Sequence, residues 1–183
     1  MRRSTWVVLV IFLALVGLTL YLSQNKPPID DANLTPTAVV EYLFDETAGL
    51  PTSIAIESKN GEQVAIERNE AGVWVLKQPV EAEADQGSAE AAASQLTALR
   101  ILSRPEVAPA DAGLVDPSYT MTVKLSGGTE QVVRIGDLTP TGSGYYTNID
   151  GSDEILILGQ TGLDALLTLV TSPPFVSTPT PIP

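Results

Sequence analysis

The amino-acid sequence predicts an α+β fold: two antiparallel β-meanders, each followed by a helix as a pseudo-repeat, with one N-terminal transmembrane helix. Three observations lead to this prediction. Apolar and polar residues alternate in two separate stretches, apolar residues recur at helical spacing after each stretch, and an uncharged apolar run lies near the start. Alternation with period two is typical of strands with one buried face, whereas spacings of three and four residues are typical of amphipathic helices.

The uncharged run covers residues 5–22 and is long enough to cross a membrane. At 1.5 Å rise per residue, a helix of this length spans about 27 Å, close to the roughly 30 Å hydrocarbon core of a bilayer. Arg2 and Arg3 precede the run, and the positive-inside bias places such residues in the cytoplasm. Signal cleavage is the alternative, but no pattern of small residues follows. We therefore expect a single-pass signal-anchor in the cytoplasmic membrane, with residues 1–4 inside and the C-terminal domain outside.

The chain beyond this anchor divides into three parts by composition. Residues 23–38 are polar and contain several prolines, which predicts a linker. Residues 39–171 carry the alternating and helical patterns, and this length is sufficient for one exocytoplasmic domain with its own core. Residues 172–183 are rich in proline and threonine and cannot form a packed core, so we expect a disordered tail there.

The first half of the domain begins with strand patterns. An apolar run at residues 39–44 predicts a first strand. The alternation that starts at Ile54 predicts two further strands joined by a turn at residues 59–61. Another apolar run at residues 73–76 predicts a strand that ends before Pro79.

An alanine-rich stretch at residues 85–103 predicts the first helix of the domain. Asp85 or Ser88 can cap its first turn, because short polar side chains accept hydrogen bonds from the unpaired amides at a helix start. The apolar face of this helix consists of Leu96, Leu99 and Leu102.

The second half repeats the strand pattern. A shift of 69 residues places Val123 on Ile54 (123 − 54 = 69) and Ile135 on Ile66 (135 − 66 = 69). A strand-like run at residues 154–158 then precedes an amphipathic helix with Leu163, Leu166, Leu167 and Val170 on one face. The predicted core comprises Ile54, Ile56, Val64, Ile66, Trp74, Leu76, Leu96, Leu99, Val123, Leu125, Val133, Ile135, Ile155, Ile157, Leu163 and Leu167.

Charge and composition argue against several classes of function. Beyond the anchor, 22 acidic residues stand against eight basic ones (10 − 2), which gives a formal charge of 8 − 22 = −14. This charge argues against binding to nucleic acid, whose phosphates require a basic surface, and against lying on anionic lipid headgroups. The acidity can serve solubility or the capture of cations. The absence of cysteine and histidine removes disulfides, thiolate nucleophiles, the commonest general base and the commonest transition-metal ligand.

Several motifs can be interpreted as sites, but each also has a structural interpretation. Residues 150–154 are acidic like a calcium loop, but they are too few for the twelve-residue EF-hand pattern and predict a hairpin turn. The glycines at 127–128 and 142–144 could cradle a phosphate. Neither pair precedes a helix or a lysine, so we predict turns at both places.

Among three carboxylates at alternate positions, two could pair for acid–base chemistry, but the three are predicted to form a solvated linker and a helix cap. They are Glu81, Glu83 and Asp85. Trp74 is predicted to anchor the core rather than to form a ligand platform.

A series of short motifs along residues 39–169 resembles the domain of unknown function 4340 (DUF4340) family. The motifs are Leu43-Phe44, Ile54 with Ile56, Gly72-Val73-Trp74-Val75-Leu76 with Pro79, Ala84-Asp85, Gly113-Leu114-Val115-Asp116-Pro117, Arg134-Ile135-Gly136 and Tyr145-Tyr146. Val115 departs from the family pattern, which has an acidic residue there. The resemblance implies a membrane-anchored exocytoplasmic protein encoded beside ABC-type transport components similar to those of gliding-motility systems. It carries over no catalytic residue, because the family pattern consists of turns and core positions.

We therefore expect no catalytic, cofactor-binding or metal-binding residue, and no cofactor. The expected function is that of a non-catalytic, membrane-anchored accessory protein that contacts other membrane-protein subunits and is associated with an ABC-type transporter. The alternative is an exocytoplasmic domain that binds a small ligand or a cation, which an apolar pocket with convergent polar groups would favour. The second alternative is a hydrolase, which a perturbed titratable pair in a cleft would favour.

Overall fold

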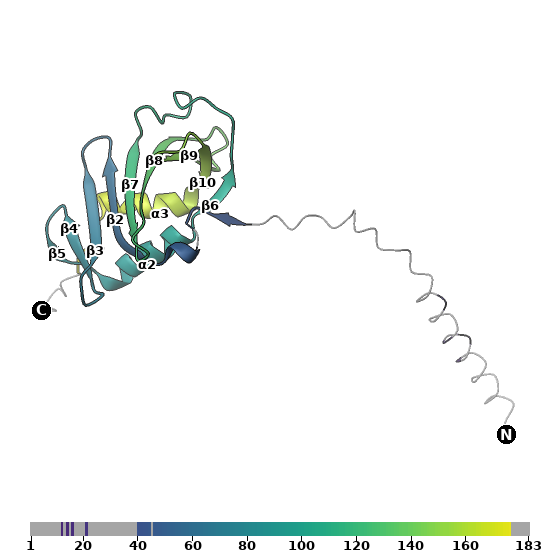
Figure 1. The fold of residues 1–183 in the computed structure, drawn as a ribbon, viewed down its shortest axis with the longest axis horizontal. Helices are drawn as coiled ribbons and strands as arrows, with labels where there is room; N and C mark the ends of the chain where they lie inside the picture. The colour runs from purple at the N-terminus through teal and green to yellow at the C-terminus, as the bar shows by residue number, and fades with distance from the viewer. Residues whose placement is uncertain are drawn as a thin grey trace, which may run out of the picture. The chain divides into compact units, whose positions relative to one another are not determined.

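The computed structural model describes residues 40–44 and 46–176, and in addition Phe12, Ala14, Val16 and Tyr21. The chain divides into two units, Met1–Val39 and Val40–Pro183, and the domain described below belongs to the second unit (Figure 1). Its helices are η2 (Glu46–Ala48), α2 (Gln86–Thr97) and α3 (Gln160–Thr171). Its strands are β1 (Glu41–Tyr42), β2 (Pro51–Ser58), β3 (Gln63–Arg68), β4 (Trp74–Gln78), β5 (Ala82–Glu83), β6 (Arg100–Ser103), β7 (Tyr119–Leu125), β8 (Glu130–Leu138), β9 (Gly144–Ile149) and β10 (Ile155–Gly159).

Within the described residues, these ten strands form one antiparallel sheet in the order β1-β6-β10-β9-β8-β7-β2-β3-β4-β5. Strands β2 and β7 pair near its middle, where Ile54 lies opposite Val123 and Ile56 lies opposite Met121. From this pair, β3, β4 and β5 continue to one edge of the sheet. The other five strands continue to the opposite edge.

The prediction of two meanders, each followed by a helix, is therefore wrong. The β2–β7 pair joins the strands of both halves into a single sheet. Strand β6, which follows α2, pairs with β10 and β1 and so starts no new meander. Alternation of apolar residues determines which face of a strand is buried, but it does not determine which strand lies beside it. The pairing partners are selected by packing across the whole sheet.

The transmembrane helix of the predicted fold is also not observed. No helix in the described part of the chain is both long enough and apolar enough to cross a bilayer. The predicted anchor at residues 5–22 falls outside the described residues except for four separate positions. The predicted linker at 23–38 and residues 177–183 of the predicted tail fall outside them as well. The described part of that tail includes Phe175, which forms an isolated β-bridge with Ala84.

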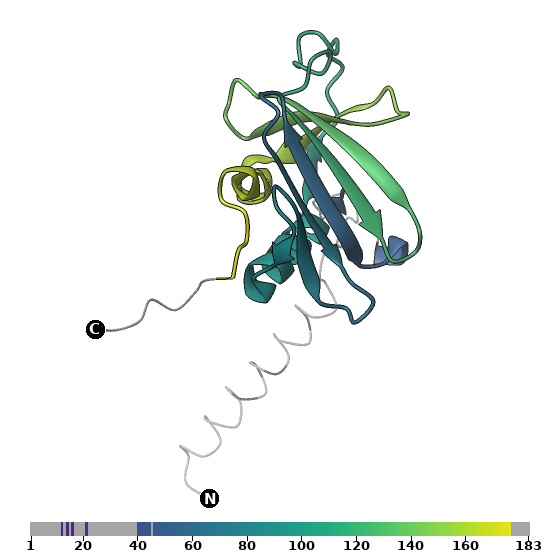
Figure 2. The same ribbon diagram turned by 90° about the vertical axis from the view of Figure 1, so that its left-hand side faces the viewer.

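The main core lies between one face of the sheet and the two helices. Figure 2 shows α2 and α3 on the same side of the curved sheet. Burial of each large apolar side chain contributes about 1.5–3 kcal/mol to stability. The largest fully buried side chains are Trp74, Ile54, Ile56, Ile66, Leu76, Leu96, Leu99, Met121, Ile135, Leu158, Leu163 and Leu166.

Helix α2 begins where the sequence predicts and ends earlier. The side chain of Asp85 accepts a hydrogen bond from the backbone N–H of Ser88 at 2.8 Å, which confirms the predicted cap. The helix is capped at Ala98, and the chain then extends into β6. The predicted helix at 85–103 was therefore too long, and Leu102 lies on β6 with 51% of its surface exposed. Buried alanines allow α2 to approach the sheet closely: Ala89, Ala92 and Ala93.

Every predicted core residue except Ile157 is buried. Ile157 is half-buried, because Leu156 and Leu158 are the residues of β10 that belong to the main core. Ile155 is buried in a second, smaller cluster with Leu114. Strand β10 is apolar on both faces since a loop covers the face that points away from the helices.

The predicted strand at 39–44 is only two residues long, as β1. Beyond it, Leu43 and Phe44 turn into the core, and the backbone N–H of Leu43 donates to the carbonyl oxygen of Leu99 at 2.8 Å. The first residues of the domain are thus held by the segment that follows α2.

Arg104 joins three segments at this edge of the sheet. Its guanidinium forms a bidentate ion pair with the carboxylate of Glu41 on β1. Its Nε lies 2.9 Å from the carboxylate of Glu154, the residue just before β10. The hydrogen bond from Arg104 lowers the pKa of Glu41 below its ordinary value. All three side chains are substantially exposed, so the contribution of these ion pairs to stability is small.

Candidate functional site

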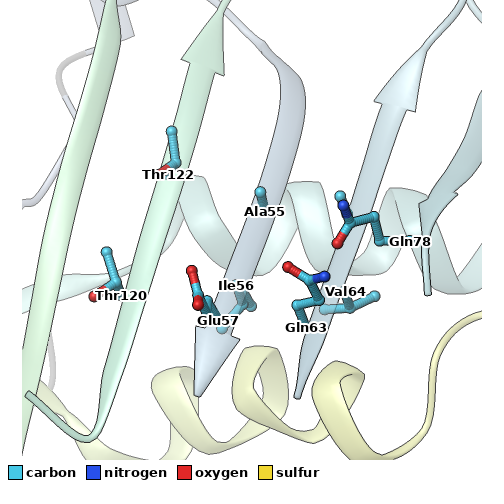
Figure 3. Close-up of a pocket in the computed structure, with 9 residues that line it drawn as sticks. Ala55, Ile56, Glu57, Gln63, Val64, Gln78, Thr120 and Thr122 are labelled. Atoms are coloured by element: carbon cyan, nitrogen blue, oxygen red, sulfur yellow. The ribbon is translucent and has the colours of Figure 1, made fainter. Parts of the chain in front are cut away.

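The face of β7, β2 and β3 that points away from α2 and α3 carries a shallow hollow of about 160 Å³ (Figure 3). Ala55 of β2 and Ala65 of β3 lie opposite each other and form its floor. Thr122 lies opposite Ala55 on the β7 side, and Gln78 lies opposite Ala65 on the β4 side. The hollow exists because two methyl side chains stand together between longer ones. We refer to this surface as the open face.

Five polar side chains surround the hollow: Glu57, Gln63, Gln78, Thr120 and Thr122. None of these side chains forms a hydrogen bond or ion pair with another residue of the described chain. Glutamine and threonine can both donate and accept hydrogen bonds, whereas the glutamate carboxylate can only accept them. Pockets that enclose small ligands usually measure about 300–1,000 Å³, so this smaller, open surface is better suited to contact with another polypeptide.

A second concavity, of about 310 Å³, lies between the segment 104–118 and the turn that joins β9 to β10. We refer to it as the loop cleft. Its apolar lining consists of Pro109, Leu114 and Ile155, and its polar lining consists of Arg134, Asn148, Ser152 and Asp153.

The segment 104–118 is held firmly against the sheet. Leu114 and Ala112 pack with Ile155 of β10, and the backbone N–H of Asp137 donates to the carbonyl oxygen of Ala112 at 3.0 Å. Gly136 lies so close to the same carbonyl oxygen that a Cβ atom there would overlap it. The shape of the loop cleft is therefore fixed by contacts within the domain itself.

Some hydrogen-bond donors and acceptors of the loop cleft have no partner within the described protein. Arg134 forms an ion pair with Asp150 through one terminal nitrogen. The side-chain amide nitrogen of Asn148 donates to the carbonyl oxygen of Glu154 at 3.0 Å and to that of Ser152. This arrangement leaves donors on the guanidinium and an acceptor on the amide oxygen available.

Trp74 lies at the centre of a group of interacting side chains that stabilises the fold and lines neither the open face nor the loop cleft. The residue is 1% exposed, and its Nε1–H donates to the carboxylate of Glu90 at 2.8 Å. The guanidinium of Arg68 lies 4.5 Å from the ring centroid and 2.6 Å from the same carboxylate. The hydrogen bond from Trp74, together with Arg68, lowers the pKa of Glu90. The prediction that Trp74 anchors the core is confirmed.

The acidic and glycine-rich motifs are turns, as predicted. Residues 150–154 join β9 to β10, with Gly151 at a φ of +83°, which favours glycine. Residues 127–128 lie in the turn between β7 and β8, where the backbone N–H of Gly128 donates to the carbonyl oxygen of Leu125 at 2.9 Å. Gly142 lies in the turn between β8 and β9, whereas Gly144 is already the first residue of β9.

The three alternate carboxylates form no common site. Glu81 pairs with Lys77 at 2.5 Å, Asp85 caps α2, and Glu83 lies exposed on β5. The backbone N–H of Ser88 lowers the pKa of Asp85. Over the described residues, no group of three or more carboxylates is placed to hold a metal ion.

One tyrosine has a strongly shifted pKa, but it lines neither concavity. The hydroxyl of Tyr145 on β9 donates to the carboxylate of Asp164 on α3 at 2.7 Å. Burial, and secondly the neighbouring carboxylate of Asp164, raise the pKa of Tyr145 to about 12. A group that stays protonated at neutral pH in this way links the helix to the sheet and is not suited to act as a base.

Sequence reasoning missed both concavities. The open face is signalled by Ala55 and Ala65, which are small residues at outward positions of strands whose inward positions are large. The loop cleft is signalled by Leu114, an apolar residue within a loop. Neither signal identifies a cavity until the pairing of the strands is known.

The chain matches the family model described as Domain of unknown function (DUF4340) over residues 52–172, which is more than half of its length. No match was found among curated proteins or among solved structures. The matched residues run from β2 through α3 and so include both the open face and the loop cleft. Their extent agrees with the motif order seen in the sequence. The chain belongs to the DUF4340 family.

Proposed function

We propose that this protein is a non-catalytic accessory subunit that docks onto another polypeptide of a membrane assembly through its open face. The observation that supports this proposal is the group of five polar side chains around Ala55 and Ala65 that have no partner within the described chain. A partner can form hydrogen bonds with them without first breaking bonds inside the domain. This reduces the cost of removing polar groups from water on binding.

The open face rests on a rigid support. Ile56 and Val64 belong to the same strands as the hollow, and both are fully packed against the helices. A surface that is fixed in advance loses little conformational entropy when a partner binds. Glu57 and the formal charge of −14 beyond residue 22 favour a partner surface with hydrogen-bond donors and basic side chains.

The proposed location is the outer side of the cytoplasmic membrane, and it rests only on the amino-acid sequence of residues 1–22. The proposed association with an ABC-type transporter rests on the family resemblance. Confinement to a membrane raises the effective concentration of a domain near a membrane partner. Docking through a surface of modest area is then sufficient for a lasting association.

Site-specific photo-crosslinking tests this proposal. A photoreactive amino acid is placed in the full chain at Thr122 or Gln63 on the open face, or at Ser94 on the exposed side of α2 as a control. We expect the two open-face positions to crosslink to the same membrane-associated polypeptide and Ser94 to give no such product. Equal crosslinking from all three positions, or none from the open face, would contradict the proposal.

A matched pair of substitutions provides a second test. Ala65→Arg fills the hollow with a long charged side chain, whereas Ala71→Arg makes the same change in the exposed turn between β3 and β4. We expect only Ala65→Arg to abolish co-purification of the crosslinked polypeptide, provided that circular dichroism shows a folded protein. Retention of the partner by Ala65→Arg would show that docking uses another surface.

A further inference from the structure

The loop cleft resembles small-molecule sites in its volume and in having one apolar and one polar side. Its volume of about 310 Å³ lies at the lower end of the range of roughly 300–1,000 Å³ for ligand pockets. Pro109, Leu114 and Ile155 form an apolar wall, and polar side chains form the rest. An aliphatic group can be buried against this wall while a polar group faces the other side.

Arg134 provides the donors for a carboxylate. Its planar guanidinium carries five N–H groups, and the ion pair with Asp150 engages one terminal nitrogen. It has no other hydrogen-bond partner in the described chain. A carboxylate can therefore bind to the remaining donors without displacing Asp150.

Asp153 and Asn148 provide acceptors for an ammonium group. The carboxylate of Asp153 lines the cleft and forms neither a hydrogen bond nor an ion pair within the described residues. The amide nitrogen of Asn148 is engaged by two backbone carbonyl oxygens, so its amide oxygen stays available. An ammonium group has three donors and can use both acceptors.

The charge of the cleft distinguishes between ligands. The charged residues that line the cleft, Arg134 and Asp153, have formal charges that sum to 1 − 1 = 0, and Asp150, which pairs with Arg134 from outside the lining, brings the total to −1. This net negative charge would repel a ligand that carries only an anionic group. A ligand that carries only an amine would leave the free donors of Arg134 without a partner. A molecule with one carboxylate, one ammonium and an aliphatic group satisfies all three kinds of lining group at once.

We propose that the loop cleft binds a free α-amino acid with an aliphatic side chain. The carboxylate binds Arg134, the ammonium binds Asp153 and Asn148, and the side chain packs against Leu114 and Ile155. This site lies on different residues from the open face, and the proposal is independent of the docking function.

Isothermal titration calorimetry of the full chain in a mild detergent tests this proposal, with L-leucine as the probe. Three related compounds each remove one group: leucine amide lacks the carboxylate, N-acetyl-leucine lacks the ammonium, and glycine lacks the side chain. We expect leucine to bind at least about tenfold more tightly than each of them, as the loss of one charge-assisted hydrogen bond or of a buried aliphatic group predicts. Absence of leucine binding, or equally tight binding of N-acetyl-leucine, would overturn the proposal.

A pair of conservative variants locates the site. Asp153→Asn removes the negative charge of an exposed side chain that forms no hydrogen bond or ion pair in the described chain, so we expect it to leave the fold intact. Glu130→Gln removes a carboxylate that pairs with Lys124 outside the cleft. We expect Asp153→Asn to weaken leucine binding about tenfold and Glu130→Gln to leave it unchanged. Equal affinities in the two variants would overturn the proposal, and neither result bears on the crosslinking from the open face.

Discussion

Replacing Gln86 with alanine should destabilise the domain by about 3 kcal/mol, because this side chain completes the hydrogen bonding at one end of β4. Its amide oxygen accepts from the backbone N–H of Trp74 at 2.9 Å, and its amide nitrogen donates to the carbonyl oxygens of Trp74 and Ala84, both at 2.8 Å. Strand β5 pairs with Val75 and Leu76 but stops short of Trp74. Three hydrogen bonds at a net value of about 1 kcal/mol each give the expected loss.

Chemical denaturation followed by circular dichroism measures this change, and the midpoint of thermal unfolding should fall by about 10 °C. Gln95→Ala is the matched control, since it makes the same substitution in α2 at a side chain without a hydrogen bond in the described structure. We expect Gln95→Ala to change the free energy of unfolding by less than about 0.5 kcal/mol. Equal losses in the free energy of unfolding for the two substitutions would refute this explanation. They would show that water can replace the hydrogen bonds of the Gln86 amide without a loss of stability.

Gln86→Glu gives an independent test through its pH dependence. The introduced carboxylate still accepts from Trp74 N–H, but it faces two carbonyl oxygens with no donor. This environment disfavours the charged form and raises the pKa of the introduced glutamate in the folded state. The protonated form restores one donor, so the variant is more stable below the unfolded-state pKa and loses this stability as pH rises through the folded-state pKa. A variant whose stability is the same at acidic and neutral pH would contradict this account.

The further predictions concern a core leucine, a glycine of β8 and the tyrosine that is hydrogen-bonded to α3. Leu163→Ala should lower the free energy of unfolding by about 2–5 kcal/mol in urea titrations, because the side chain is fully buried beneath the sheet. Gly136→Ala should lower the free energy of unfolding by about 1–3 kcal/mol, because the added methyl group would overlap the carbonyl oxygen of Ala112. Gly159→Ala is the control and should lower it less, since its Cβ would have nothing within 4 Å. Equal losses of stability in the two variants would exclude the close approach as the cause. Tyr145 should ionise near pH 12 in a spectrophotometric titration, with the stability it contributes fully present below pH 10 and lost as pH rises through about 12. Asp164→Asn should lower this pKa while leaving it above 10, because burial remains, and an unchanged pKa would rule out the carboxylate as a cause.

Local patterns predicted the elements whose two faces differ strongly. The alternation around Ile54 and Ile66 identified β2 and β3, since each strand has one apolar and one polar face. Asp85 is recognisable in the sequence as a helix cap because its effect is limited to the first turn of α2. In both cases the information lies within a few residues of the element itself.

Patterns failed where local spacing fitted more than one structure. Leu102 follows Leu99 at a helical spacing, but the chain has already left α2, and Leu102 lies on β6. In β10, four consecutive apolar residues contain no alternation, so the sequence could not show that Leu156 and Leu158 face the helices and Ile157 does not. The two-residue strands β1 and β5 are shorter than any periodic signal.

The two concavities depend on contacts between residues distant in the sequence. The open face needs Ala55 beside Ala65 and Thr122, and the last of these is 67 residues away from the first (122 − 55 = 67). The loop cleft needs Leu114 to pack against β10. A single sequence predicts which residues are small or charged, but it does not show which of them share a surface.

The position of β6 between β1 and β10 determines the order in which the chain can fold. Tyr42 of β1 pairs with Arg100, so 58 residues (100 − 42 = 58) must be synthesised before the first strand meets its partner. Ile101 of that partner pairs with Leu158, which lies close to the end of the domain. Pairings between distant segments form slowly because the intervening chain must first be closed into a loop. The domain should therefore reach its native state only after β10 has been synthesised, and not stepwise as its earlier strands emerge.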